Sequence, residues 1–216
     1  MKQLNVNSAY VDLYRQKKRY KHLFGGRGAG RSFEVAQYAI TKLYSPEYFR
    51  GILARQHFAD IRGSSFQQII DIIEEKELQS DFHILENTMQ ITHLKTGNRI
   101  FAKGFRAASG NSTAKMKSIT EATFVWIEEA DEVSKDDFDK LDKSLRSMKG
   151  AELEIIFTYN TDNEDCFLKS EFHDKVRPED TLLIHATYKD NYKNLHPDYI
   201  RVLERMIKDD PEAARS

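Results

Sequence analysis

The sequence predicts an α/β fold in which helices cover both faces of a mainly parallel sheet. Apolar runs recur along the 216 residues and are nearly unbroken, which is typical of strands that are buried on both faces. Segments with apolar residues at helical spacing separate many of these runs, as in a sheet built from alternating strands and helices. The length suits one large domain, or one domain with a small appendage.

The first part of the chain alternates between the two kinds of segment. Apolar spacing predicts helices within residues 1–19, 32–44 and 66–73. Apolar runs predict strands at residues 20–24 and 51–54.

The rest of the chain is richer in strands. Residues 82–105 alternate as in a β-meander, with a turn at residues 95–98 between two of its strands. The other expected elements are strands at residues 122–127, 153–157 and 182–186 and helices at residues 136–148 and 199–208.

Charge and cysteine content narrow the class of protein. The formal net charge is −1, so the whole chain carries no field that attracts polyanions. Residues 1–32 hold eight Lys or Arg and one acid, whereas residues 121–142 hold nine acids and two Lys. This asymmetry suits a site for phosphate and a divalent cation, although two solvated faces of opposite charge would look the same. With one cysteine, Cys166, and no apolar run of membrane-spanning length, we expect a soluble intracellular protein.

A glycine-rich loop joins the first strand to the next helix and matches the phosphate-binding pattern G-x-x-x-x-G-K-[ST], with Arg in place of Lys. Its residues are Gly25, Gly26, Arg27, Gly28, Ala29, Gly30, Arg31 and Ser32. Glycines let backbone N–H groups turn towards phosphate oxygens, and the helix N-terminus adds partial positive charge. Ser32 is the expected Mg²⁺ ligand, and Arg31 is the expected cation for the β- and γ-phosphates. The alternative is a glycine-rich turn with chance charges.

Two carboxylates end the strongly apolar strand at residues 122–127, where Glu128 and Glu129 follow directly. In a site that hydrolyses a nucleotide, one carboxylate at such a strand end holds Mg²⁺ and a second polarises the attacking water. We assign Glu128 to the metal and Glu129 to the base. Solvated acids after a strand are the alternative interpretation.

Polar residues also follow the strand at residues 153–157. Because ligands of open α/β sheets bind at the carboxyl ends of strands, Thr158 or Asn160 is placed to sense the γ-phosphate. An ordinary turn that contains Asn is the alternative.

Together these motifs resemble the large terminase subunit of tailed bacteriophages, and the likeness runs through most of the chain. The matching stretches are residues 24–32, 53–55, 61–65, 101–105, 115–118, 125–133, 156–160 and 187–192. The resemblance implies an additional-strand P-loop ATPase core in which hydrolysis of ATP with Mg²⁺ drives double-stranded DNA into a procapsid. It also implies non-specific contact with the DNA backbone, a homo-oligomeric ring, the portal protein and a small terminase subunit as partners, and the host cytoplasm as location.

The resemblance extends to particular residues. Arg19 and Tyr20 are candidates for an adenine pocket, and residues 158–160 become the motif that couples hydrolysis to DNA movement. Arg27 could reach the γ-phosphate of its own site. The candidates for a cation that acts on a neighbouring subunit's site are Arg106, Lys115, Lys117 and Arg146.

Two departures from the family pattern bear on activity. Residues 1–186 are expected to form the ATPase domain and residues 187–216 a linker, without the nuclease domain usual in large terminases, so no nuclease activity is expected. Arg31 replaces Lys, and its planar guanidinium differs from a compact ammonium. The alternative function is therefore a nucleotide-binding assembly module with impaired hydrolysis. A helicase is a third candidate, against which the lack of helicase motifs after residue 160 argues.

Overall fold

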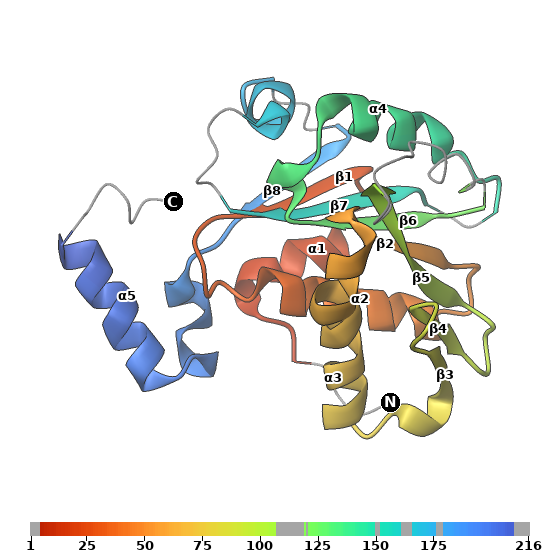
Figure 1. Cartoon of the computed structure of the whole chain (residues 1–216), viewed down its shortest axis with the longest axis horizontal. Coiled ribbons are helices and arrows are strands. Elements are labelled where there is room, and N and C mark those ends of the chain that lie inside the picture. Colours follow the sequence, from red (N-terminus) through yellow and green to blue (C-terminus); the bar gives the residue numbers. More distant parts are fainter. Residues whose placement is uncertain are drawn as a thin grey trace.

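The computed structural model describes residues 5–106, 119, 121–149, 152–160, 166–175 and 179–209. Eight strands within these residues form one sheet in the order β3-β4-β5-β2-β6-β7-β1-β8 (Figure 1). The strands are β1 (Tyr20–Phe24), β2 (Arg50–His57), β3 (Phe82–Leu85), β4 (Gln90–His93), β5 (Arg99–Arg106), β6 (Phe124–Glu128), β7 (Glu154–Tyr159) and β8 (Thr181–His185).

The sheet is mainly parallel, as predicted. Every neighbouring pair from β5 to β8 in the sheet order is parallel. The β3–β4 and β4–β5 pairs are antiparallel, which confirms the β-meander at residues 82–105. Its last strand, β5, joins the meander to the parallel part of the sheet. The carboxyl ends of β2, β6, β7 and β1 therefore meet along one edge.

Helices cover both faces of the sheet (Figure 1). They are α1 (Val11–Arg15), α2 (Arg31–Tyr44), α3 (Gln67–Glu75) and α4 (Lys135–Ser144), while α5 (Pro197–Asp209) lies to one side of the sheet. The first three lie on one face, and α4 lies on the other. None of the helices that the structure describes is both long and apolar enough to cross a membrane.

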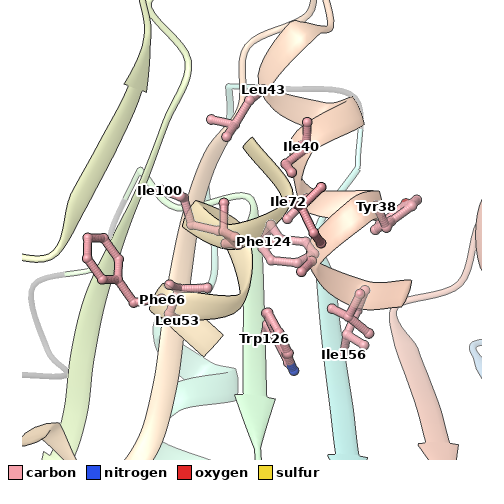
Figure 2. Packing of buried hydrophobic residues seen from close by; sticks show 14 of the residues in the cluster. Tyr38, Ile40, Leu43, Leu53, Phe66, Ile72, Ile100, Phe124, Trp126 and Ile156 are labelled. Carbon is pink, nitrogen blue, oxygen red and sulfur yellow. The ribbon is translucent and has the colours of Figure 1, made fainter. Parts of the chain in front are cut away.

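Successive strand residues alternate between two apolar cores. Trp126 and Ile156 face α2 and α3, where they belong to the same buried cluster as Ile40 and Ile72 (Figure 2). The neighbouring strand residues, such as Phe157, pack in a second cluster with α4. This alternation explains why the strands read as continuous apolar runs, since both of their faces are buried.

The helix expected at residues 136–148 is shorter than predicted. Ser134 caps its N-terminus by accepting a hydrogen bond from the Asp137 backbone N–H. Its C-terminus comes at Ser144, where the Arg19 guanidinium donates to the backbone carbonyls of Asp142 and Leu145. A cation that satisfies the last carbonyls stabilises a helix end, so a residue far away in the sequence sets this boundary.

Candidate nucleotide site

The glycine-rich loop lies between β1 and α2, at the carboxyl edge of the parallel strands. Gly25, Gly28 and Gly30 have φ angles of 129°, 81° and 81°, in the region that favours glycine. A Cβ atom on Gly25 would lie 2.1 Å from the backbone oxygen of Ala186, which follows β8. Gly30 is the N-cap of α2, so the loop ends on a helix N-terminus, where anions are stabilised.

Two segments from opposite ends of the chain brace this loop. The Tyr10 hydroxyl donates to the Ala29 carbonyl over 2.8 Å. Asn191, in the 3-10 helix Tyr188–Asn194, donates from Nδ2 to the Gly28 carbonyl over 2.9 Å. The loop is therefore held by side chains that the loop motif itself does not contain.

Arg31 connects the loop to the end of β7. Its Nη1 donates to the carbonyl of Gly25 and, over 2.7 Å, to that of Gly26. Its Nη2 donates to Asn160 Oδ1 over 2.6 Å. Arg27 is exposed on the loop, while Ser32 is half-buried in the first turn of α2.

Glu128 is the last residue of β6 and fits the role of a metal ligand. It is 7% exposed, and its Oε2 has no hydrogen-bond partner in the part of the chain that the structure describes. A buried, unpaired carboxylate oxygen is costly, and a cation would satisfy it. No group of three His, Cys, Asp or Glu that could hold a metal occurs among the described residues. Mg²⁺ needs no such cage, because it is commonly held by one or two protein groups together with phosphates and water.

Glu129 has a strained backbone and a perturbed carboxyl group. Its φ of 49° is left-handed, which is uncommon for a residue other than glycine and recurs at functional sites. Burial raises the pKa of its carboxyl group, and the negative charge of Asp131 raises it further, while the charge of Arg55 opposes the shift. A carboxylate with a raised pKa is better suited to accept a proton from water.

Asn160 lies between the loop and the acids. Its Oδ1 accepts from Arg31, and its Nδ2 donates to Glu129 Oε2 over 3.4 Å. Thr158 differs, because it is 2% exposed and its hydroxyl accepts from Trp126 Nε1 over 2.9 Å. Of the two residues considered as phosphate sensors, the geometry favours Asn160.

Residues 17–216 match the family model described as phage terminase large subunit. The chain belongs to the phage terminase large subunit family. A curated relative, the PBSX phage terminase large subunit of Bacillus subtilis (strain 168), is 27% identical in an alignment that is 229 residues long and includes 97% of this chain. The chain spans 51% of the length of that relative.

Solved large terminases share the fold. The large terminase from a thermophilic bacteriophage has a TM-score of 0.73 at 14% identity, over 94% of this chain and 50% of that one. A form of that protein in complex with ATP-gamma-S has a TM-score of 0.66 at 14% identity, over 94% and 49%. The Thermus phage P74-26 large terminase ATPase domain has a TM-score of 0.65 at 12% identity, over 98% and 90%. These likenesses confirm the P-loop ATPase fold of the terminase chain.

The structure does not bring Arg19 and Tyr20 to the site. They lie at the start of β1, about 13 Å of strand away from the loop. There Arg19 Nη2 donates to Asp142 Oδ1 over 2.7 Å, and the Tyr20 hydroxyl donates to Asp142 Oδ2 over 2.9 Å. This position does not support a part in an adenine pocket and corrects that expectation.

Of the four candidates for a cation that acts on a neighbouring subunit's site, the structure describes the side chain of one. Arg146 is exposed just after α4, beside the start of β1 and so at the edge opposite its own phosphate loop. Lys115, Lys117 and the side chain of Arg106 lie outside the described residues.

A cavity beside the loop was not predicted from the sequence. It has a volume of about 920 Å³ and opens next to Gly30. Its lining includes Asn5, Asn7, Phe33, Gln37 and Asn191. These residues come from the N-terminal segment, α2 and the 3-10 helix after β8, so only the folded chain brings them together. The sequence offers one slight indication of this cavity, which is the aromatic residue Phe33 directly after Ser32.

Proposed function

We propose that this terminase chain binds ATP with Mg²⁺ at residues 25–32, hydrolyses it, and uses the reaction to move double-stranded DNA into a procapsid. One observation carries the proposal. Arg31, Asn160 and Glu129 form a continuous chain of contacts beside Glu128, whose buried carboxylate has an unpaired oxygen among the described residues. The large terminase of the thermophilic bacteriophage, which shares the fold, forms a complex with ATP-gamma-S.

Each residue of the site has a part in this proposal. The loop amides and the N-terminus of α2 hold the phosphates, and Arg31 and the exposed Arg27 offset their charge. Ser32 and Glu128 hold Mg²⁺, which when bound neutralises charge on the β- and γ-phosphates. Glu129 accepts a proton from the attacking water, and Asn160 links that event to the loop through Arg31.

The cavity beside Gly30 is our candidate for the base of the nucleotide. Its amide side chains can hydrogen-bond to the edge of a purine, and the ring of Phe33 offers an apolar surface. The base would then lie between α2 and the segments that brace the loop. Residues 187–216 would then act as a linker whose first part also completes the nucleotide site.

The partners follow from the family and are part of the proposal. DNA contact through backbone phosphates would be independent of base sequence and sensitive to salt. A homo-oligomeric ring, the portal protein and a small terminase subunit complete the proposed motor in the host cytoplasm. Arg146, exposed at the edge opposite its own loop, remains a candidate for a cation that acts on a neighbouring subunit's site.

One observation favours the second candidate function, a nucleotide-binding module with impaired hydrolysis. The guanidinium of Arg31 is bound to two loop carbonyls, whereas the family pattern has lysine at this position. Replacement of Arg31 by lysine separates the two functions, because only the impaired module should gain turnover from it.

Glu129→Gln tests the hydrolytic role. Removing the base should lower kcat by at least about 100-fold, because general bases contribute about 10²–10⁴ to rates. ATP binding should persist, since the phosphate loop is untouched. Phosphate release measures turnover, and a fluorescent ATP analogue measures binding. Glu121→Gln, which removes a carboxylate bonded to Arg50 and Lys149 away from the site, is the matched control. Unchanged turnover in Glu129→Gln would remove Glu129 from the base role.

A further inference from the structure

Tyr159 is the middle residue of the stretch 158–160, between Thr158 and Asn160. It is 4% exposed and packs in the core on the α4 face of the sheet, opposite Thr158. Its hydroxyl lies 3.2 Å from His22 Nδ1 and 2.6 Å from His173 Nε2. A histidine on β1, a tyrosine on β7 and a histidine on the helical turn Lys169–His173 thus form one hydrogen-bonded chain.

The protons in this chain have one favoured arrangement. His22 is fully buried, and its Nε2 has no hydrogen-bond partner among the described residues. A buried N–H without an acceptor is less tolerated than a buried acceptor without a donor, so the proton of His22 belongs on Nδ1. His22 then donates to the Tyr159 oxygen, and the Tyr159 hydroxyl donates to His173 Nε2. Burial lowers the pKa of both imidazoles, which keeps His173 neutral and able to accept.

Aromatic packing connects the same chain to the phosphate loop. The ring of Phe24, the residue before Gly25, stacks on Tyr159 with centroids 5.9 Å apart and meets His173 edge-on at 4.5 Å. His22 stacks on Phe157, which precedes Tyr159 on the same face of β7, at 4.3 Å. The last residue before the loop and the last residue before Asn160 therefore pack in one cluster.

The end of β7 is consequently held on both faces of the sheet. On the α2 face, Trp126 binds the hydroxyl of Thr158. On the α4 face, the two histidines bind the hydroxyl of Tyr159. Asn160 follows Tyr159 directly and bridges Arg31 and Glu129.

We propose that His22, Tyr159 and His173 are positioning residues that hold Asn160 between Arg31 and Glu129. The proposal rests on the proposed function, because it assigns these residues a part in ATP turnover. It adds the helical turn Lys169–His173, which no motif marks, to the parts of the molecule on which hydrolysis depends.

Tyr159→Phe tests the proposal, with Tyr38→Phe as a closely matched control. Tyr38 is also 4% exposed, and its hydroxyl also has two partners, Lys21 at 3.2 Å and Glu154 at 2.7 Å, at the opposite edge of the sheet. Both variants lose one buried hydroxyl, so their melting temperatures should fall similarly. Only Tyr159→Phe should lower kcat, by about tenfold or more, because misplacement by about 1 Å can cost about 10²-fold. Its KM and the Kd for a fluorescent ATP analogue should stay within about twofold of the parent values, because the proposal leaves the groups that bind the nucleotide in place.

Two substitutions of His173 separate positioning from packing. In His173→Gln, the amide oxygen can replace Nε2 as acceptor, so turnover should be kept. In His173→Leu the acceptor is lost, and kcat should fall as it does in Tyr159→Phe. Equal turnover in Tyr159→Phe and Tyr38→Phe, or equal loss in the two His173 variants, overturns the positioning role while the proposed function stands. A parent chain that binds no nucleotide and shows no turnover refutes the proposed function, and the positioning role with it.

Discussion

At residue 31 an arginine stands where the phosphate-binding pattern has lysine, and its contacts show why the two residues are not equivalent here. The planar guanidinium donates to two loop carbonyls with one nitrogen and to Asn160 with another. A lysine ammonium is a point charge at the end of a flexible chain, and it cannot donate from two separate nitrogens in one plane as the guanidinium does. The loop and the end of β7 are therefore joined by a residue whose shape matters as much as its charge.

Arg31→Lys should lower kcat, by about tenfold, because the link from the loop to Asn160 is weakened while the positive charge is kept. The Kd for ATP should change less than kcat does. Steady-state phosphate release together with analogue binding measures both. A large gain in turnover would instead support the module with impaired hydrolysis, in which arginine is the defect.

Short sequence motifs mark the residues that the structure brings together at the candidate site. Glu128 and Glu129 follow the end of a buried strand, and the topology brings that end beside the phosphate loop, as expected. Arg19 was misplaced because closeness to the loop in sequence is not closeness in space when a strand runs between them. Asn191 could not be found at all, since its bond to Gly28 joins residues 163 positions apart.

At the scale of elements, a buried network fastens β1, β7 and α2 at the edge opposite the site. Glu154, 3% exposed, accepts from Lys21 over 3.0 Å, from Tyr38 over 2.7 Å and from Lys42 over 2.8 Å. Burial alone would raise the pKa of Glu154, but the charges of Lys21 and Lys42 and these hydrogen bonds hold it below its usual value. The sequence shows these charges, but nothing in it marks them as buried partners.

This network predicts a pH dependence of stability. Because the folded pKa of Glu154 is depressed, its contribution is present above the unfolded value of about 4.3 and is lost as the pH falls through the lower folded pKa. Glu154→Gln should cost about 3 kcal/mol at pH 7, since it leaves Lys21 buried with its charge uncompensated. Below about pH 4.3, the free energy of unfolding should also fall less steeply with pH in Glu154→Gln than in the parent protein. Urea unfolding at several pH values measures both effects, and parallel pH profiles for the two proteins would contradict this account.

Most helices and strands could be predicted from the sequence, because they depend on the local spacing of apolar residues. The order of the strands in the sheet could not. Apolar runs marked β1, β2, β6, β7 and β8, since strands buried on both faces carry few polar residues. The sequence contains no local signal that places β7 between β6 and β1. The end of α4 was also missed, because Arg19 rather than a local residue satisfies the carbonyls of its last turn.

Across the whole molecule, the N-terminal segment and the 3-10 helix Tyr188–Asn194 meet beside the phosphate loop. Asn7 donates from Nδ2 to the Asp190 carbonyl over 2.9 Å, next to Asn191, which binds Gly28. The loop, the N-terminal segment and the 3-10 helix Tyr188–Asn194 are thus one structural unit. Nucleotide binding should accordingly depend on residues well outside the motif.

Asn191→Ala measures this dependence. Loss of the bond to the Gly28 carbonyl should raise the Kd for ATP about fivefold, which corresponds to about 1 kcal/mol for one hydrogen bond. Asn87→Ala, a substitution in the exposed turn between β3 and β4, is a control that should leave the Kd unchanged. An unchanged Kd in Asn191→Ala would show that the brace has no part in nucleotide binding.

The central claim is that residues 25–32, with Glu128, Glu129 and Asn160, form a working site for ATP. A crystal structure of the chain with Mg²⁺ and a non-hydrolysable ATP analogue tests it most directly. The account predicts phosphates within the loop against Arg31, the cation on Ser32 and Glu128, and the base in the cavity lined by Asn7 and Phe33. Phosphates bound away from the loop, or a cation that avoids Glu128, would contradict it.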